Sequence, residues 1–337
     1  VLVFVVTAIA SLGLGEMARW FAVRRNVIDV PNDRSSHRVP TPRGGGVAIA
    51  LVSIAGVALL GLSGSVPGWI VLGFCVPGAA IAMVGLLDDV MQLAASTRLV
   101  VHVVACAGGL LALPALEFAG LRVGLLPVAL LAPLMLLVLV WSVNLYNFMD
   151  GIDGIAGMEA VFAGLMIAIL SHRIAGPASG LPAVALAGAA GGFLVLNWPP
   201  ARIFMGDSGS AFLGYALCFL GLALSHAGVN LWALLIVVGA FVSDATVTLV
   251  RRLLRREDIL KPHRSHAYQR LTDRFGGHLP VTRLYGMVNV FWLAPLALVA
   301  QEWPDWAGLI AVLAYLPLVS GVALMGSNAA VGVNPQR

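Results

Sequence analysis

The sequence predicts an all-α integral membrane protein, and three observations support this. Sixty per cent of the 337 residues are hydrophobic, 11% are charged, and the mean hydropathy is +0.95. Soluble domains carry roughly a quarter charged residues, so most of this surface faces a solvent other than water. A helix needs roughly 20 apolar residues to cross a bilayer, and the chain offers about eleven such stretches between short polar loops. We therefore expect a polytopic bundle of about eleven transmembrane helices.

The expected spans follow one another along the whole chain. The first, near 1–22, could be the apolar core of a signal peptide, but its apolar run continues to Trp20 and Phe21, which favours a span. No internal repeat or low-complexity linker divides the chain, so residues 1–337 are expected to form a single transmembrane domain. The other ten spans are placed near 44–63, 68–87, 97–115, 127–146, 155–171, 179–196, 209–225, 230–250, 283–300 and 305–324.

The basic residues orient the bundle. Five lie in 23–43 and nine in 251–283, whereas the loops of opposite parity hold only Arg122 and Arg173. Lys and Arg in short loops stay cytoplasmic, so we expect the N-terminus outside and the C-terminus in the cytoplasm, in a cytoplasmic (inner) membrane. A nucleic-acid partner is not expected, because no soluble module accompanies the basic stretches. The predicted cytoplasmic loops are 23–43, 88–98, 147–154, 197–208 and 251–282.

Acidic residues collect in these same loops. They are Asp88, Asp89, Asp150, Asp153 and Asp207. An ionisable group at membrane depth costs roughly 2.5–3.5 kcal/mol on insertion scales, so such a gathering needs a reason. Loop solvation is the alternative, but the apolar residues around the first four disfavour it. The sequence thus predicts an acidic, metal-ready site on the cytoplasmic face.

Two motifs carry most of these acids. Asp88 and Asp89 end the third span, where adjacent carboxylates suit Mg²⁺ or proton abstraction. The second motif runs from Asn144 to Gly154 and places Asn144, Asn147 and Asp150 three residues apart, on one side of a helix. Its glycines allow the backbone to approach a ligand closely. Four oxygen-bearing side chains within this motif indicate a site rather than packing.

Asp207 lies between glycines, just before the eighth span. It could be a helix N-cap, and Ser208 could serve equally. A site role is compatible with capping, because a helix N-terminus also offers free N–H groups to phosphate. A metal-bound diphosphate would then use the carboxylate and the amides together.

Two loops add groups that suit phosphate. The first cytoplasmic loop combines Arg38 and Arg43 with a glycine run that opens the second span, so its side chains and exposed amides could bind phosphate, although such glycines also serve packing alone. The last long loop contains His263, Arg264 and His266. Two histidines could bind a transition metal, but the neighbouring basic residues favour a phosphate or a lipid headgroup.

Together these motifs resemble the polyprenyl-phosphate N-acetylhexosamine-1-phosphate transferases, the membrane family (glycosyltransferase family 4) that includes the phospho-MurNAc-pentapeptide translocase. The resemblance covers about Asp29 to Pro280, with the motifs in the family's order. It implies phosphoryl transfer: a polyprenyl phosphate oxygen attacks the sugar-side phosphorus of a UDP-sugar, and UMP leaves.

The resemblance also implies site residues. The catalytic set is Asp88, Asp89, Asp150 and Asp153, with Asp88 assisting the lipid phosphate as a base or by orientation and the last two ordering the nucleotide. Mg²⁺, for which Mn²⁺ could substitute, falls on Asp207, with Asn147 as a candidate second ligand. The implied substrate-binding residues are Arg38, Thr41, Arg43, Gly44, Gly45, Asn144, Asn147, Gly154, His263, Arg264 and His266.

Two departures from the family's motifs help to choose between its branches. Gln92 stands where many relatives have a third acid, and the last loop reads His-Arg-Ser-His rather than three consecutive histidines. The second departure favours the branch that initiates O-antigen, lipopolysaccharide and related glycans over the peptidoglycan translocase, which stays the alternative. Asp244 resembles an acidic position of the family, but an ion pair with Arg would explain it equally.

The expected partners are a UDP-activated amino sugar, undecaprenyl phosphate and membrane lipid, with a homodimer left open. A secondary transporter or lipid flippase is the rival of another class. That rival predicts polar residues near the middle of the membrane, whereas the acids here gather at one face.

Overall fold

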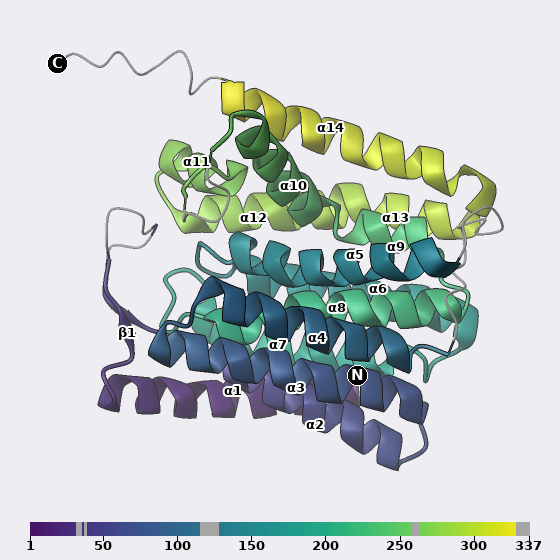
Figure 1. Cartoon of the computed structure of the whole chain (residues 1–337), viewed down its shortest axis with the longest axis horizontal. Helices are drawn as coiled ribbons and strands as arrows, with labels where there is room; N and C mark the ends of the chain where they lie inside the picture. The colour runs from purple at the N-terminus through teal and green to yellow at the C-terminus, as the bar shows by residue number, and fades with distance from the viewer. Residues whose placement is uncertain (32–35, 37–38, 115–127, 258–262, 328–337) are drawn as a thin grey trace.

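Long apolar helices make up most of the structure, because a chain in hydrocarbon must satisfy its backbone polar groups internally. The computed structural model describes residues 1–31, 36, 39–114, 128–257 and 263–327, and its helices lie side by side with roughly parallel axes (Figure 1). In chain order the elements are α1 (Leu2–Arg24), β1 (Ile28–Asp29), β2 (Thr41–Pro42), α2 (Gly46–Leu62), α3 (Gly68–Met91), α4 (Ala95–Ala112), α5 (Val128–Met149), α6 (Ile155–Ala175), α7 (Leu181–Asn197), α8 (Asp207–His226), α9 (Leu231–Val237), α10 (Gly239–Leu254), α11 (Ala267–Phe275), α12 (His278–Val288), the π-helical turn η2 (Asn289–Leu293), α13 (Ala294–Glu302), the 3₁₀ turn η3 (Pro304–Trp306) and α14 (Ala307–Ser327).

The prediction of a polytopic helical membrane protein is confirmed. In the described part of the chain, eight helical segments are long and apolar enough to cross a membrane, or up to nine if the bent pair α9–α10 forms one span. Helices α2 and α7 occupy two further expected spans but have 17 residues each. That is about 26 Å of helix, slightly less than a hydrocarbon core of about 30 Å. The count of eleven spans and the orientation stay predictions.

The expected span 230–250 is not one straight helix, which corrects the sequence analysis. It breaks after Val237, and α9 and α10 are bent by 76°. Side chains that capture freed backbone groups stabilise such bends. Here the Tyr315 hydroxyl donates to the carbonyl of Leu235, 2.7 Å away. Gly239 follows the break with Leu293 and Tyr315 packed closely against it.

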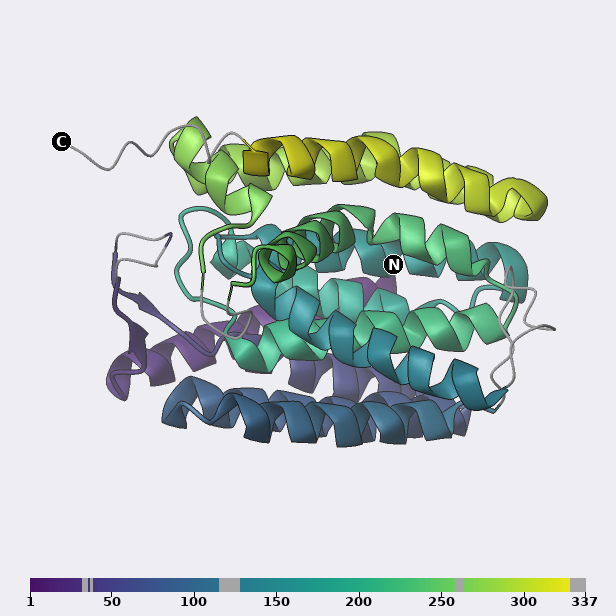
Figure 2. The ribbon, with the colours of Figure 1, turned by 45° about the horizontal axis from the view of Figure 1, so that its top comes forward.

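Helix α8 lies inside the bundle rather than at its edge. Of its apolar window, 94% is buried, against 17% for α1 and 22% for the last span. It packs on α2, α3, α5 and α6, and the purple-to-blue and yellow ends of the chain lie on opposite sides of it (Figures 1 and 2). Glycines permit the close approach, since a Cβ on Gly214 would collide with the backbone of Ser142 in α5.

The described parts of the predicted cytoplasmic loops meet at one end of the bundle, at the left of Figure 1. Two short elements that the sequence analysis did not anticipate lie there. Strands β1 and β2 pair antiparallel, with Ile28 opposite Pro42 and Asp29 opposite Thr41. Helix α11 begins at Ala267 within the last loop. This end of the bundle holds the polar residues of interest.

Candidate active site

Asp207 is the first residue of α8 and lies between two arginines. Its Oδ1 is 2.5 Å from Arg43 Nη2, and its Oδ2 is 2.7 Å from Arg98 Nη1. Asn147 Nδ2 also donates to Oδ2, at 3.1 Å. Burial disfavours the charge of Arg43, but the carboxylates of Asp89 and Asp207 outweigh this and raise its pKa. The structure therefore brings together Asp207, Asn147 and Arg43, as expected.

Asp89 caps helix α8 from a different helix. Its Oδ1 accepts a hydrogen bond from the amide of Asp207, at 2.9 Å, and its Oδ2 accepts one from the amide of Ser208, at 3.2 Å. Arg43 Nε lies 2.9 Å from Oδ1, and the Asp89 side chain is 1% exposed. Gly206, with φ of 74°, precedes the helix, and a Cβ there would collide with this carboxylate. The first two amides, which the sequence analysis offered to phosphate, are therefore already engaged.

Asp88 faces Arg98 rather than a helix terminus. Its Oδ1 accepts from the amide of Leu93, at 2.7 Å, and its Oδ2 lies 2.6 Å from Arg98 Nη1. The same Arg98 nitrogen reaches Asp207, so one guanidinium links the two acids. Arg98 is not among the site residues expected from the sequence. Its place as the single basic residue in the loop 88–98 was available as an indication, but a basic loop residue is also what topology requires.

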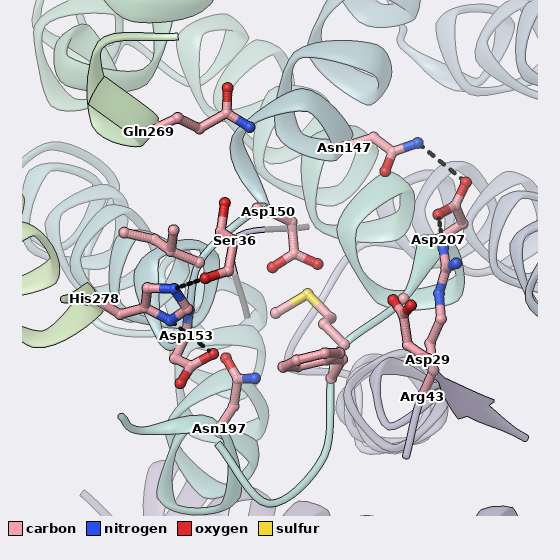
Figure 3. A pocket seen from close by; sticks show the side chains of 15 residues that line it. Asp29, Ser36, Arg43, Asn147, Asp150, Asp153, Asn197, Asp207, Gln269 and His278 are labelled. Carbon is pink, nitrogen blue, oxygen red and sulfur yellow. Dashed lines mark hydrogen bonds and ion pairs between the residues drawn. The ribbon is translucent and has the colours of Figure 1, made fainter. Parts of the chain in front are cut away.

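Asp150 follows α5 and points into the cavity, between Asp207 on one side and His278 on the other (Figure 3). Burial is the main cause that raises the pKa of its carboxyl well above the ordinary value. Arg43 opposes this shift and the carboxylate of Asp207 reinforces it. Asn144, two turns earlier in α5, instead donates to the carbonyl of Val140, at 2.8 Å. Of the three residues Asn144, Asn147 and Asp150, the last two line the cavity.

Asp153 is held by the protein on both carboxylate oxygens. Oδ2 accepts from the amide of Ala201, at 3.0 Å, and Oδ1 lies 3.1 Å from His278 Nδ1. His278 Nε2 donates to the carbonyl of Ser36, at 3.0 Å. Asn197 Oδ1 accepts from the amide of Gly154, whose φ is 77°. His278 and Asn197 were missed, because a polar residue at a helix end is also a common structural feature.

The glycine loop does not present the free amides that its sequence suggested. Gly45 N donates to the carbonyl of Phe204, at 3.0 Å, and Gly46 N to that of Met205, at 2.8 Å. Gly44, with φ of 95°, is at the turn before them. Thr41 is buried and its hydroxyl donates to the carbonyl of Val39. The loop thus ties α2 to the segment before Asp207. Arg38 lies outside the described residues.

The last loop splits into an exposed and a buried part. Arg264 is exposed and pairs with Asp273, at 3.2 Å. His263 stacks on His266 with ring centroids 4.9 Å apart, and burial lowers the pKa of His263 to about 4. His263 is therefore neutral at pH 7 and adds no positive charge. His266 is 3% exposed and lies 3.3 Å from Asp244.

Asp244 is a second acidic residue that caps a helix from a different segment of the chain. It is fully buried and accepts from the amides of Ala267 and Tyr268 at the start of α11, at 2.8 and 2.9 Å, and from the Tyr285 hydroxyl, at 2.7 Å. Its role in the described structure is to seat α11 and His266.

A cavity of about 230 Å³ lies between Asp207 and Asp153. Asp207, Arg43 and Asn147 line one side, and Asp153, His278 and Asn197 the other (Figure 3). A second cavity of about 510 Å³ shares Ser36, Asp153, Phe204 and His278 with it and extends to Arg264 and Asp273. Together they offer the volume of a drug-sized or nucleotide-sized ligand.

The donor atoms at the Asp207 end suit Mg²⁺. No group of three or more His, Cys, Asp or Glu side chains converges on a metal position within the described ranges. Mg²⁺ does not require one, because it is usually held by one or two carboxylates together with waters and substrate phosphates. Asp207 provides carboxylate oxygens of this kind. Asn147 has an amide oxygen, which accepts from the Ser210 hydroxyl at 3.2 Å, while its nitrogen faces Asp207. A cation on Asp207 has to compete with the two guanidinium groups.

The structure is a helical bundle with a cavity lined by acidic residues and arginine at one end. It therefore belongs to the class of multi-pass membrane proteins that have a polar site at the bilayer surface. Residues 71–225 match the model of glycosyl transferase family 4. The chain is 36% identical over 261 residues, 72% of either chain, to the phospho-N-acetylmuramoyl-pentapeptide-transferase of Synechococcus sp.. The chain belongs to glycosyl transferase family 4, which confirms the family assignment made from the motifs.

Two other relatives carry N-acetylglucosamine in their names. The probable undecaprenyl-phosphate N-acetylglucosaminyl 1-phosphate transferase of Bacillus subtilis is 29% identical over 286 residues, which are 80% of this chain and 76% of that protein. The decaprenyl-phosphate N-acetylglucosaminephosphotransferase of Mycobacterium tuberculosis is 29% identical over 285 residues, 75% of this chain and 70% of that protein.

Proposed function

We propose that the protein transfers an N-acetylhexosamine 1-phosphate from a UDP-sugar to undecaprenyl phosphate and releases UMP. The observation that carries the proposal is the gathering of Asp207, Arg43, Arg98 and Asp88 at one end of a membrane bundle, within contact distances of 2.5–2.7 Å. Phosphoryl transfer needs mainly positioning and neutralisation of charge, and this cluster provides groups for both.

In this mechanism an oxygen of the lipid phosphate attacks the phosphorus that bears the sugar. A new P–O bond forms to the lipid phosphate, the P–O bond to the UMP phosphate breaks, and UMP leaves with that oxygen. Arg43 is at the cavity wall beside Asp207, so its guanidinium can hold the diphosphate of the donor. Asp153, Asn197 and His278 shape the opposite end of the cavity, where the nucleoside would lie.

Arg98 and Asp88 suit the acceptor phosphate. Arg98 lies in α4, a span with only 22% of its apolar window buried, and its side chain is 29% exposed. Asp88 holds this guanidinium at 2.6 Å. Arg98 would bind the lipid phosphate through charge-assisted hydrogen bonds, with Asp88 orienting Arg98 or accepting a proton.

Mg²⁺ is the proposed cofactor, with Mn²⁺ as a substitute. Asp207 and Asn147 would hold it, and a bound Mg²⁺ neutralises the charge on phosphate oxygens. Arg43 and Arg98 would then be freed from Asp207 toward the phosphates. Loss of UMP release in EDTA, restored by Mg²⁺, is the expected result, and full turnover in excess EDTA would exclude the metal.

We place this site on the cytoplasmic face of the inner membrane, with the N-terminus outside and the C-terminus in the cytoplasm. The distribution of basic residues supports this orientation. Trp20 near the end of α1 supports the membrane boundary there, because Arg24 covers its ring at 3.7 Å, and Trp and Arg are common at the interface. A homodimer stays a prediction.

The sugar and the pathway are the finer part of the proposal. The His-Arg-Ser-His sequence and the relatives named for N-acetylglucosamine favour an N-acetylhexosamine donor for O-antigen or related glycans. The test is purified protein with undecaprenyl phosphate, Mg²⁺ and a panel of UDP-N-acetylhexosamines that includes UDP-MurNAc-pentapeptide. UMP and lipid-linked sugar from an N-acetylhexosamine donor are expected. Turnover of the pentapeptide donor alone would instead assign the peptidoglycan reaction.

A further inference from the structure

A row of contacts joins α12 to the start of α6 and leads from the cavity into the bundle. At the end of the row nearest the cavity, His278 pairs with Asp153, 3.1 Å away. One turn further along α12, the Thr282 hydroxyl donates to the backbone carbonyl of Asp153, at 2.8 Å. Another turn on, a Cβ on Gly286 would lie 3.4 Å from the sulfur of Met158. The two helices are therefore in register from the cavity floor downwards.

The row ends on a carboxyl group inside the membrane bundle. Asn289 Nδ2 donates to Glu159 Oε2, at 2.5 Å, and both side chains are fully buried. Glu159 is five residues beyond Gly154, about 7.5 Å along α6. An ionisable residue at this depth is by default a candidate for a functional role. The proposed reaction does not use it.

Three polar atoms in this region are buried without a hydrogen-bond partner in the described structure. They are Glu159 Oε1, Asn289 Oδ1 and the Tyr146 hydroxyl of α5. Tyr146 is within electrostatic range of Glu159. An unsatisfied buried polar group costs about 1–3 kcal/mol, so three such atoms in one region point to a bound water molecule. A buried water makes about three hydrogen bonds, which matches them in number.

Asn289 continues the helical spacing of the row, three residues after Gly286. Asn289 is the first residue of η2, and π-helical turns are rare and are found mostly at functional sites. Such a turn adds a residue to the helix and shifts the direction of the side chains that follow. The sequence before the turn continues the α-helical spacing of the row, from His278 through Thr282 to Gly286.

The carboxyl group has no basic partner in the described structure, since its one contact is the Asn289 amide. An isolated charge in a low-dielectric interior is so costly that such a group gives up its charge instead. A neutral carboxylic acid keeps one oxygen for the Asn289 donor and offers a proton to the water. This arrangement satisfies every polar atom in the cluster.

We propose that Glu159 and Asn289 form a neutral, hydrated clamp between α6 and α12 that positions the Asp153–His278 pair at the floor of the cavity. Glu159 is a positioning residue here and does not touch substrate. Because Asp153 and His278 lie on the side of the cavity opposite Asp207, the clamp affects how the donor binds more than it affects the transfer step.

The first test compares Glu159→Gln with Glu159→Leu in purified full-length protein, and its kinetic arm rests on the proposed function. Gln is neutral and has the shape of the protonated acid, so KM for the UDP-sugar should stay within about twofold of the parent value. Leu removes both polar atoms, and KM should rise about tenfold with kcat within about threefold, since small displacements at a binding site are costly.

A matched control breaks a buried hydrogen bond elsewhere in the same helical segment. Gln301 in α13 accepts from the amide of Asn230, at 2.9 Å. Gln301→Leu should lower the thermal stability as Glu159→Leu does but leave KM unchanged. If Glu159→Leu fails to accumulate, Asn289→Leu tests the other half of the clamp with the same expected KM. A parental KM in either variant would overturn the proposal.

A second measurement does not depend on turnover. The infrared difference spectrum between the parent and Glu159→Gln at neutral pH should contain the carbonyl stretch of a protonated carboxylic acid, because the contribution of Asp150, whose pKa is raised, cancels in the difference. Absence of that band, or an increase in KM in Glu159→Gln as large as in Glu159→Leu, would mean that the carboxylate is charged. A parent that releases no UMP from any UDP-sugar would overturn the proposed function alone, because the infrared test of the clamp would still apply.

Discussion

Asp89→Asn tests whether the buried cap on α8 positions Asp207. The change keeps the shape of the side chain, but an amide offers one acceptor oxygen where the carboxylate offers two. If the oxygen of the new Asn side chain stays with the Asp207 amide and Arg43, the NH₂ group of that side chain faces the Ser208 amide. Both of these groups are donors, so no hydrogen bond forms between them. One hydrogen bond to a charged acceptor is lost and the charge beside Arg43 disappears.

The magnitude follows from these contacts. A hydrogen bond to a charged group is worth about 1.5–3 kcal/mol, and breaking a buried ion pair costs about 3–5 kcal/mol. Arg43 keeps Asp207 as a partner and is 35% exposed, so the lower part of these ranges applies. We expect about 3 kcal/mol, shared between lower thermal stability and weaker transition-state binding. If all of it appears in the rate, UMP release falls about 100-fold.

The assay is UMP release at saturating donor and acceptor, together with thermal unfolding in detergent. Glu16→Gln is the matched control, because it removes the same charge from an exposed pair with Arg19 and Arg202 and should change stability by less than about 1 kcal/mol. Asp89→Asn activity within about twofold of the parent would refute the positioning role. Parental stability with no turnover would also refute it and make Asp89 a group that acts on substrate.

Three further predictions concern single residues. Asp207→Asn should abolish UMP release, measured alongside the elution of a folded protein in size-exclusion chromatography, because it removes the negative charge that Arg43, Arg98 and the proposed metal share. Arg98→Gln should raise KM for undecaprenyl phosphate at least about tenfold and leave KM for the UDP-sugar within about twofold, and the reverse pattern would assign Arg98 to the donor. The pKa of His263 is lowered to about 4 from an ordinary value near 6.5, so protonation favours the unfolded state. Stability should therefore be complete above pH 6.5, fall as the pH drops toward 4, and fall less steeply in His263→Gln, as unfolding temperatures across this range would show.

Patterns that depend on one physical rule were predictable from the sequence. The need to satisfy the backbone in hydrocarbon determined the helical class. The bias of Lys and Arg grouped the loops that carry Asp88, Asp150 and Asp207, and the described parts of these loops lie at one end of the bundle (Figure 1). The order of the motifs identified the family. The first two conclusions rest on composition and on the distribution of charge, and the third rests on a resemblance to known motifs. All of these features are present in the chain before it folds.

Contacts between distant segments were not predictable. A glycine run and a helix start both offered free amides, but Gly45 and Gly46 donate to Phe204 and Met205, and Asp89 takes the first amides of α8. Which donors stay free depends on which acceptors other helices bring, and spacing does not encode this. Arg98 was not predicted as a site residue for the same reason, because its second partner, Asp207, is 109 residues away.

The burial of α8 has a consequence for how the protein responds to its bilayer. A thicker or thinner membrane acts first on helices that touch lipid, such as α1 and the last span, which tilt or shift to match it. Helix α8 is surrounded by protein and its start is fixed to the end of α3, so Asp207 keeps its depth relative to Asp89 while the outer helices adjust. The arrangement shields the Asp207–Asp89 contact from changes in the lipid composition around the bundle.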